Sequence, residues 1–574
     1  MMKFNYIIFP VIALLFVTVG CSDFLEDDQQ YTEEEVVLTS GQRSRGLIDD
    51  LYSFYDYEYF TDFSREYLTD NAVLNSNESA LGSGYWGPTS NPYSDTWEQS
   101  YDNMRQIFQY IDLVHNKGLY YINGEAFEDI SETVIRRYYG EAFFLKAWAE
   151  WELLKVYGGP DNEGNMLGFP IVNEILEDEE YASLSRDSYD DCVAQIMADL
   201  DVAIDSLPLT YSGSDAYIGN VQIGRASGLA AYALKAKVAL YAASPAFNPT
   251  NDLSKWEEAA ALAHEAIMQN SGSLKSLQDY DYTSTTNVDH IWRLRDANLK
   301  KDLEERLYPP TLYGQGEVNP SQNLVDAFPD SKGYPISMSV EYDPANPYAS
   351  RDDRFYKFIF YNTDRSFTSE TGSDYDSLQI YEGGLDNYGG FMRTEGTRTG
   401  YYLKRFLNKL NFDPSVDNAT TSAARVYVQL GLTELYLNYA EAANEAFGPD
   451  IIPAGYNFSA KDALAQVRKR AGITSDEYLD LVAANSADFR TLLKNERRIE
   501  MCFSGERFHD LRRWNDIVAT EDVRGMKITK NADGTFSYQE VEVENRTYEA
   551  KNSYLPLPYA ELILNSNLKQ NQGW

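Results

Sequence analysis

The chain has 574 residues, of which 43% are hydrophobic and 24% are charged, an ordinary composition for a globular protein. Its length exceeds what a single hydrophobic core usually organises, so we expect either two or three domains or an extended helical array. The formal net charge of −40 disfavours nucleic-acid binding, because phosphates need lysine and arginine to replace their counterions.

The first residues predict a leader and a lipid attachment site. Residues 1–20 carry one charge, Lys3, and an apolar run that is too short to span a bilayer comfortably but suits the core of a signal peptide. Gly20 before Cys21 resembles a bacterial lipoprotein box, in which the cysteine becomes the lipidated first residue of the mature chain. Several acyl chains, at about 0.8 kcal/mol per buried methylene, would anchor it stably. An ordinary signal peptide with an incidental cysteine is the alternative.

Residues 21–40 are predicted to form a flexible tether. Ser22 to Glu35 contains seven acidic residues and no basic one, and such a charge run is usually a solvated segment. The run also resembles the acidic signal that directs lipoproteins of Bacteroidetes to the cell surface. We therefore expect a surface-exposed lipoprotein of the outer membrane.

Helical periodicity dominates the sequence after the tether. Apolar residues recur at three- and four-residue steps in residues 97–115, and the pattern continues through residues 136–159 to a Gly158-Gly159 stop. Residues 188–208 begin at a serine cap and are closed by Pro208.

Two later pairs of helical segments are rich in alanine: 224–249 with 255–270, and 430–448 with 459–472. Such pairs resemble tetratricopeptide units, whose helices approach closely. Between the pairs, Gly, Pro, Asn, Ser and Tyr crowd together and periodicity fails. We therefore predict an all-α fold, a tetratricopeptide-like helical-pair scaffold with a large irregular loop-rich subdomain. Within a domain of residues 41–574, the predicted parts are the scaffold at about 41–275 and 425–520, the irregular subdomain at about 275–425, and a C-terminal segment at 520–574.

The stretch NERRIEMCFSGERFHDLRRW, residues 495–514, raises the question of catalysis. Glu496 and Glu500 lie one helical turn apart and share a face, as paired carboxylates for acid–base work would. Neighbouring guanidinium groups, however, favour ionised carboxylates, whereas a general acid needs a raised pKa. We interpret the stretch as ion pairs and caps that join two helices across the Ser504-Gly505 turn. The residues assigned this structural role are Glu496, Arg497, Arg498, Glu500, Gly505, Arg507, Asp510, Arg513 and Trp514.

Together with other blocks, this stretch resembles the SusD/RagB family. The blocks are GRASGLAAYALKAKVALYAASPAF, PSQNLVDAF, RDDRFY, TGYYLKRF, LNYAEAANEA and the C-terminal YLPLPYAELILNSNLKQNQGW, in the family's order. Ser504 departs from the glutamate that the family often has there. The resemblance implies a surface lipoprotein that sits as a lid on a SusC-type TonB-dependent outer-membrane barrel and captures a nutrient, most often a glycan. It implies a binding protein without a cofactor, not an enzyme.

Other chemistries find little support in the sequence. The four histidines (His115, His264, His290 and His509) lack metal-ligand spacing, and GxSxG, phosphate-loop and GxGxxG motifs are absent. A glycosidase stays open, because its two carboxylates need not be close in sequence.

Glycan binding needs aromatic faces for sugar rings and polar groups for their hydroxyls. Trp97, Trp148, Trp151 and Trp256 fall on helical faces and are expected in the core. Trp86 lies in a Gly- and Pro-rich loop, where an exposed tryptophan is expected to meet a partner. Related proteins place ring-stacking residues in this early loop and in a later aromatic segment. The candidate ligand contacts are Asp70, Asn71, Tyr85, Trp86, Asn91 and Tyr93, with Trp292, Tyr308 and Tyr313 as a second wall. Packing over a neighbour or over the partner barrel is the alternative for each.

We therefore expect equilibrium capture of an oligosaccharide in a shallow aromatic-lined site over a transporter. The alternatives are a peptide or other non-glycan nutrient, a surface glycoside hydrolase, and a structural lid without ligand affinity. The sequence names neither the sugar nor its linkage, and the acidity of the chain mildly favours neutral glycans.

Overall fold

The structure is a computed structural model of the whole chain. It describes residues 41–53, 65–76, 79–115, 121–122, 125–126, 131–284, 287–293, 297–300, 302–368, 375–387, 396–410 and 422–574. The predicted leader and tether, with Cys21, lie outside these residues. Across the described ranges, we find no helix with the length and apolar character needed to cross a membrane.

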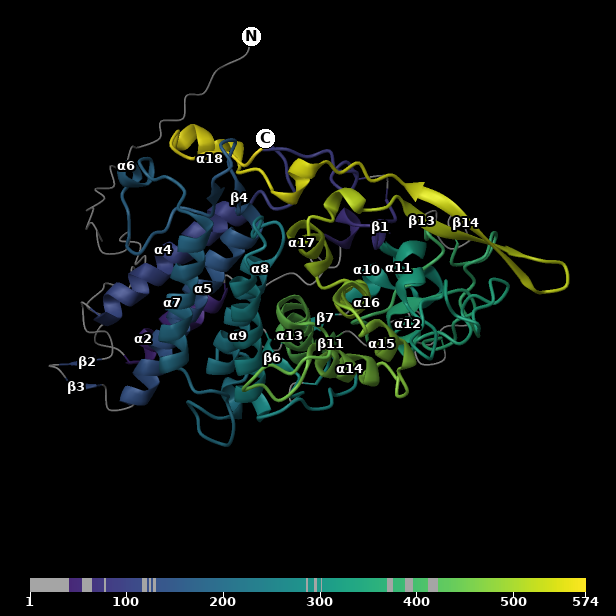
Figure 1. Cartoon of the computed structure of the whole chain (residues 1–574), viewed down its shortest axis with the longest axis horizontal. Coiled ribbons are helices and arrows are strands. Elements are labelled where there is room, and N and C mark those ends of the chain that lie inside the picture. Colours follow the sequence, from purple (N-terminus) through teal and green to yellow (C-terminus); the bar gives the residue numbers. More distant parts are fainter. Residues whose placement is uncertain are drawn as a thin grey trace, which may run out of the picture.

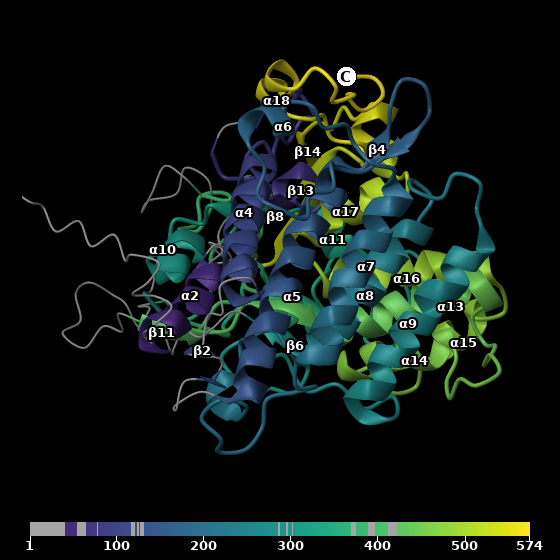
Figure 2. The same ribbon diagram turned by 90° about the vertical axis from the view of Figure 1, so that its left-hand side faces the viewer.

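Helices dominate the regular structure of the described residues (Figures 1 and 2). In sequence order, each packs mainly against its neighbours: α4 on α5, α5 on α7, α7 on α8, and α8 on α9. The last of these also contacts α13, which packs against α14 and α16. The helices are α2 (Gly41–Ser53), α4 (Thr96–His115), α5 (Glu132–Tyr157), α7 (Tyr189–Ser206), α8 (Gly228–Ala243), α9 (Leu253–Ser271), α13 (Leu432–Phe447), α14 (Ala460–Arg470), α16 (Ser486–Glu500) and α17 (Glu506–Arg513).

Local sequence signals set the limits of these helices. The Ser188 hydroxyl accepts a hydrogen bond from the Asp191 backbone N–H at 3.0 Å, and α7 ends at Ser206, before Pro208. Helix α5 ends at Tyr157, directly before the two glycines. The predicted helices, their serine cap and their stops are therefore confirmed. Buried alanines lie where α8 meets α9, and small side chains allow that close packing.

The chain between α9 and α13 forms short elements instead of long helices. Figure 1 places its short helices on the opposite side of α13 from α7, whereas residues 290–293 contact α8. The short helices of the molecule are α6 (Asp178–Tyr181), α10 (Asp302–Leu307), α11 (Gln322–Ala327), α12 (Asp353–Phe358), α15 (Glu477–Val482) and α18 (Tyr559–Leu564). The predicted all-α class is confirmed, because every sheet in the described residues has only two strands. The limits of the scaffold and of the irregular subdomain stay predictions.

The strand pairs are antiparallel. They are β1 (Ala72–Leu74) with β8 (Val318–Pro320), β2 (Tyr121–Ile122) with β3 (Glu125–Ala126), β4 (Gly159–Pro160) with β5 (Met166–Leu167), β6 (His290–Arg293) with β12 (Val428–Gly431), β7 (Ala297–Lys300) with β11 (Ser422–Arg425), β9 (Ile359–Phe360) with β10 (Tyr402–Leu403), and β13 (Val523–Lys530) with β14 (Phe536–Glu544). The β13–β14 hairpin is the longest pair, and it was not anticipated from the sequence. Its Met526 and Ile528 enter a hydrophobic cluster with Phe355 and Leu324.

Buried ion pairs join α16 to the irregular chain and to α14. Arg354 of α12 donates to Glu496 at 2.8 Å and to Glu500 at 2.9 Å. Glu496 also pairs with Arg468, and Glu500 with Arg470 at 2.7 Å, both from α14. Burial raises the pKa of each glutamate, but the guanidinium groups outweigh it and lower both pKa values below the ordinary range. These carboxylates are therefore ionised and structural.

A second group of buried ion pairs joins α16 to α17 and α13. Arg497 donates to both oxygens of Asp510 at 2.7 and 2.8 Å, and Arg513 donates to Asp510 at 2.9 Å. Arg513 also donates to both carboxylate oxygens of Glu441 of α13, at 2.6 and 2.7 Å, and the Trp514 indole donates to that carboxylate at 2.7 Å. The Arg497–Asp510 pair confirms the predicted link between the two helices. We call these two groups together the ionic frame: Arg354, Glu441, Arg468, Arg470, Glu496, Arg497, Glu500, Asp510 and Arg513.

The turn between α16 and α17 is held by a buried glutamate. Phe503 and Gly505 both have positive φ, at 62° and 79°. The Phe503 N–H donates to Glu66 Oε1 at 2.6 Å, and the Asn71 amide donates to Glu66 Oε2 at 2.8 Å. Burial raises the pKa of Glu66 to about 7, and these two hydrogen bonds offset only part of that rise.

The ionic frame predicts that truncating one of its arginine side chains lowers the free energy of unfolding strongly. Arg497→Met removes one of the two buried cations that pair with Asp510 and one of the two that pair with Glu434, and leaves Arg513 and Lys237 beside them. We therefore expect a loss of about 3 kcal/mol in the free energy of unfolding. Lys255→Met is the matched control, because Lys255 pairs with an Asp190 that is 72% exposed and should lose about 1 kcal/mol or less. Equilibrium urea unfolding measures both, and equal losses would contradict the role of the frame.

Glu66 predicts a pH-dependent stability. Its folded-state pKa of about 7 lies above the ordinary 4.5, so its contribution is fully present below pH 4.5 and is lost as pH rises through 7. Glu66→Gln removes this titration. Relative to the natural chain, the variant should therefore gain about 3 kcal/mol between pH 4.5 and pH 8.5, at about 1.36 kcal/mol per pKa unit. Urea unfolding across this range measures the difference, and a constant offset would refute the assignment.

Candidate ligand-binding pocket

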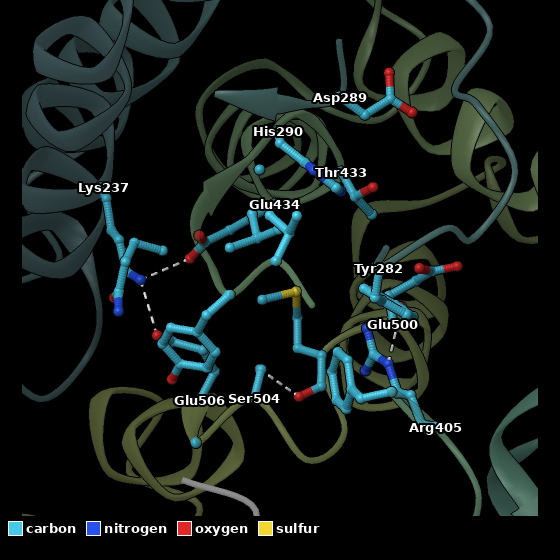
Figure 3. Close-up of a pocket in the computed structure, with 18 of the residues that line it drawn as sticks. Lys237, Tyr282, Asp289, His290, Arg405, Thr433, Glu434, Glu500, Ser504 and Glu506 are labelled. Carbon is cyan, nitrogen blue, oxygen red and sulfur yellow. Dashed lines mark hydrogen bonds and ion pairs between the residues drawn. The ribbon is translucent and has the colours of Figure 1, made fainter. Parts of the chain in front are cut away.

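An open pocket lies where the long helices meet the irregular chain (Figure 3). Its lining comes from α5 and α8, from residues 279–282 and 287–290, and from residues 426–434. The turn 501–505 and the start of α17 close its base. The pocket therefore rests directly on the ionic frame, whose Glu500 is among its lining residues.

Tyrosines of the acidic segment 279–282 form an aromatic wall. The Tyr282 ring lies 4.4 Å from the Phe406 ring, and its hydroxyl accepts a hydrogen bond from Arg405 at 3.1 Å. The Tyr280 hydroxyl donates to Glu500 at 2.6 Å. Tyr427, which is half-buried like Tyr282, also lines the pocket. These contacts hold partly exposed rings in fixed positions.

A lysine-centred cluster forms the opposite wall (Figure 3). Lys237 of α8 contacts Glu434 at 2.9 Å and Glu506 at 2.8 Å. These glutamates stand in the first turns of α13 and α17, where the helix dipole favours negative charge. Burial raises the pKa of Glu506, but Lys237, with Lys155 and Arg497, outweighs it and lowers the pKa to about 2. Glu506 is therefore ionised and accepts hydrogen bonds only.

The two histidines of the pocket are uncharged at neutral pH. Burial, helped by the nearby Arg293, lowers the pKa of His290 to about 4. Burial also lowers the pKa of His509 well below its ordinary value. Within the described ranges, no group of three or more His, Cys, Asp or Glu side chains is placed to hold a metal ion.

Trp86 is not the exposed loop tryptophan that the sequence analysis expected. Its ring is 8% exposed, stacks on Trp574 at 5.1 Å, and meets the Phe508 ring edge-on at 6.4 Å. The expectation of exposure is wrong because residues from the C-terminal part of the chain cover the loop. Tyr85 beside it is 70% exposed and does not line the pocket.

The predicted second wall is not at the surface either. Trp292 is 1% exposed, lies edge-on to Trp148 at 4.7 Å, and donates its indole N–H to the Gly224 carbonyl at 3.2 Å. It packs behind Trp148, which does line the pocket. Tyr308 is fully buried, and its hydroxyl donates to the Asn408 carbonyl. Half-buried Tyr313 does not line the pocket.

Asp70 and Asn71 are occupied by the structural motif instead of being available for sugar hydroxyls. Asp70 pairs with Arg498 at 2.8 Å and with Arg507 at 3.4 Å. The Asn71 side-chain oxygen accepts from Arg498 at 2.7 Å. Both residues are buried, because the charged motif recruits partners from far along the chain.

Tyr93 is the one predicted ligand contact in the described residues that lines the pocket. It is 4% exposed, its ring lies 5.0 Å from His509, and the Arg65 guanidinium sits 4.3 Å over it. Asn91 is buried and positions Tyr93 by accepting its backbone N–H at 2.8 Å.

The sequence analysis missed the tyrosines that form the aromatic wall. Tyr280 and Tyr282 stand in the stretch DYDYTSTTN, where two aromatic residues alternate with acids before a turn-rich segment. That pattern indicates a candidate binding segment. The aromatic residues that complete the wall, Phe406 and Tyr427, are more than a hundred residues away in sequence. Only the fold brings them together.

Comparisons with known proteins agree with this architecture. A curated relative, SusD-like protein P25 of Formosa agariphila, is 23% identical over 100% of this chain and 99% of its own. A SusD-like protein of Bacteroides fragilis has a crystal structure that superposes with a TM-score of 0.71 at 22% identity, covering 96% of this chain and 99% of its own. A SusD-like carbohydrate-binding protein of the same organism gives 0.68 at 19% identity, over 93% and 100%. These similarities show a shared fold.

Family models match both parts of the chain. A model described as starch-binding and associating with the outer membrane matches residues 23–240. The SusD family model matches residues 264–574, which is more than half of the chain. The chain therefore belongs to the SusD family.

Proposed function

We propose that this protein captures an oligosaccharide at the cell surface, in the pocket lined by α5, α8 and residues 279–282 and 287–290. Membership of the SusD family supports glycan binding, as do the starch-binding description of the second family model and the carbohydrate-binding relative of B. fragilis. The pocket residues are our proposal for the site.

One observation carries the assignment: partly exposed aromatic rings and polar side chains share a pocket. Tyr282, Phe406 and Tyr427 are half-buried, so each keeps ring surface for the apolar side of a sugar. Carboxylate and amide groups of the same pocket, such as those of Glu434 and Gln429, suit its hydroxyls. This combination orients a sugar ring without chemistry.

The carboxyl groups of the pocket support binding without hydrolysis. A glycosidase needs a general acid with a raised pKa opposite a second carboxylate. Glu500 and Glu506 have lowered pKa values and are held by cations. Asp289 is the exception, because burial raises its pKa, but it is buried and accepts the Gln278 backbone N–H at 2.5 Å. The raised pKa of Asp289 is the one observation that keeps hydrolysis as the second candidate function.

The same proposal includes anchoring and delivery. Lipidation of Cys21 would hold the chain at the outer membrane through the acidic tether, in agreement with the outer-membrane association in the second family description. Delivery to a SusC-like TonB-dependent barrel would then move the captured glycan across the membrane. Capture of a peptide or another nutrient by the same mechanism is the alternative that a glycan panel tests.

We expect residues 22–574 to bind one class of polysaccharide in affinity electrophoresis and calorimetry. Tyr282→Ala should weaken that binding by about ten-fold, because it removes the aromatic face against which the apolar side of a sugar ring would pack. Tyr282→Phe keeps the ring and should stay within about three-fold of the natural chain. Product analysis of the same mixtures should show no new reducing ends.

Tyr85→Ala is the matched control, because Tyr85 is exposed and lies outside the pocket. Loss of binding in Tyr85→Ala, but not in Tyr282→Ala, would place the site at the early loop. Absence of binding to every glycan would contradict the proposed function and favour a peptide ligand or a structural lid. Steady release of oligosaccharides would favour hydrolysis.

A further inference from the structure

The pocket is more negative than positive. Seven carboxylate residues line it, against five lysines and arginines. Asp281 stands in the exposed part of the lining, where Thr283 donates to it at 2.8 Å from the backbone and at 2.7 Å from the hydroxyl. These hydrogen bonds lower the pKa of Asp281, which keeps it charged at neutral pH. No lysine or arginine of the described chain pairs with it.

The cations of the pocket are already engaged by the protein. Three of them pair with carboxylates of the pocket at 2.7–2.9 Å. The pairs are Lys237 with Glu434 and Glu506, Lys155 with Glu152, and Arg470 with Glu500. Arg405 is buried and donates to the Cys502 carbonyl and to Tyr282, while Arg65 lies over the Tyr93 ring. An anionic ligand group would have to compete with these partners for its counter-charge.

Uncharged donors, in contrast, line the pocket without a partner. The indole N–H groups of Trp148 and Trp151 belong to side chains that are 3% and 0% exposed, and neither has a hydrogen-bond partner among the described residues. The Gln429 amide nitrogen is also buried and unpaired there. A buried donor left unpaired costs about 1–3 kcal/mol, so a ligand oxygen that reaches one of these N–H groups would gain a favourable hydrogen bond.

A sugar hydroxyl suits both sets of groups. It accepts from an indole or amide N–H and donates its own proton to a carboxylate such as Glu434 or Glu506. A ligand carboxylate or sulfate only accepts, so it cannot donate to those carboxylates, and it adds like-charge repulsion. We propose that this pocket selects neutral glycans and rejects uronate- or sulfate-bearing ones. The inference rests on the proposed function, whose site it specifies.

The test compares one glycan with its oxidised form. A panel of neutral polysaccharides (starch, laminarin and galactan) and acidic ones (polygalacturonate and alginate) identifies the ligand of residues 22–574 at low ionic strength. The tightest neutral ligand is then oxidised at its primary hydroxyls to carboxylates. We expect its Kd to rise by about ten-fold or more, and the rise to shrink at about 0.5 M salt, where charges are screened.

Two variants separate charge from folding. Asp281→Asn should reduce the ratio of oxidised to neutral Kd by about three-fold or more, because it removes the unpaired charge. Asp533→Asn is the matched control: Asp533 accepts the same two hydrogen bonds from Thr535, but it lies in the turn of the β13–β14 hairpin, outside the pocket (Figure 1). It should keep the natural ratio.

Three results would overturn the inference. The first is a panel in which only the acidic polysaccharides bind, and the second is an equal Kd for the neutral and oxidised forms. The third is a ratio that Asp281→Asn leaves unchanged. Each leaves the proposed capture of a glycan intact, whereas no binding to any glycan refutes both proposals.

Discussion

The structure depends on charges that are buried and paired with each other. Arg354 and the arginines of α14 pair with Glu496 and Glu500 of α16. Asp510 pairs with Arg497, and Glu441 pairs with Arg513. A buried pair adds little net stability over apolar packing, but the loss of one partner is costly. Any arrangement of α13, α14, α16, α17 and the irregular chain that separates these pairs is therefore disfavoured, because it leaves buried charges unpaired. It explains the charge of the 495–514 stretch without catalysis.

The same network reaches the pocket and shapes what the pocket offers. Glu500 accepts from Tyr280 and Arg405 donates to Tyr282, so the aromatic wall is tied to the frame. Lys237 links two helix starts across the opposite wall. Because the cations are used in this way, the groups left for a ligand are rings, unpaired N–H donors and carboxylates. Rigid placement of such groups lowers the ordering cost of binding.

The sequence predicted local structure well and long-range contacts poorly. The limits of α7 are set by residues next to it in the sequence, the serine cap before the helix and the proline after it. The burial of Trp86 depends on Trp574, and the pairing of Asp70 depends on Arg498, so neither was visible locally. The motif was interpreted as a set of ion pairs, and most of the partners in those pairs lie outside the motif. Tyr282 became a candidate only once the fold set Phe406 against it.

A crystal structure of residues 22–574 with the tightest-binding oligosaccharide tests the central claim most directly, that capture takes place in the pocket built on the ionic frame. The account predicts a sugar ring against the face of Tyr282, with hydroxyls within hydrogen-bond distance of the pocket carboxylates and of the Trp148 indole. A sugar bound at the loop around Tyr85 and Trp86, with the pocket filled only by water, would contradict it.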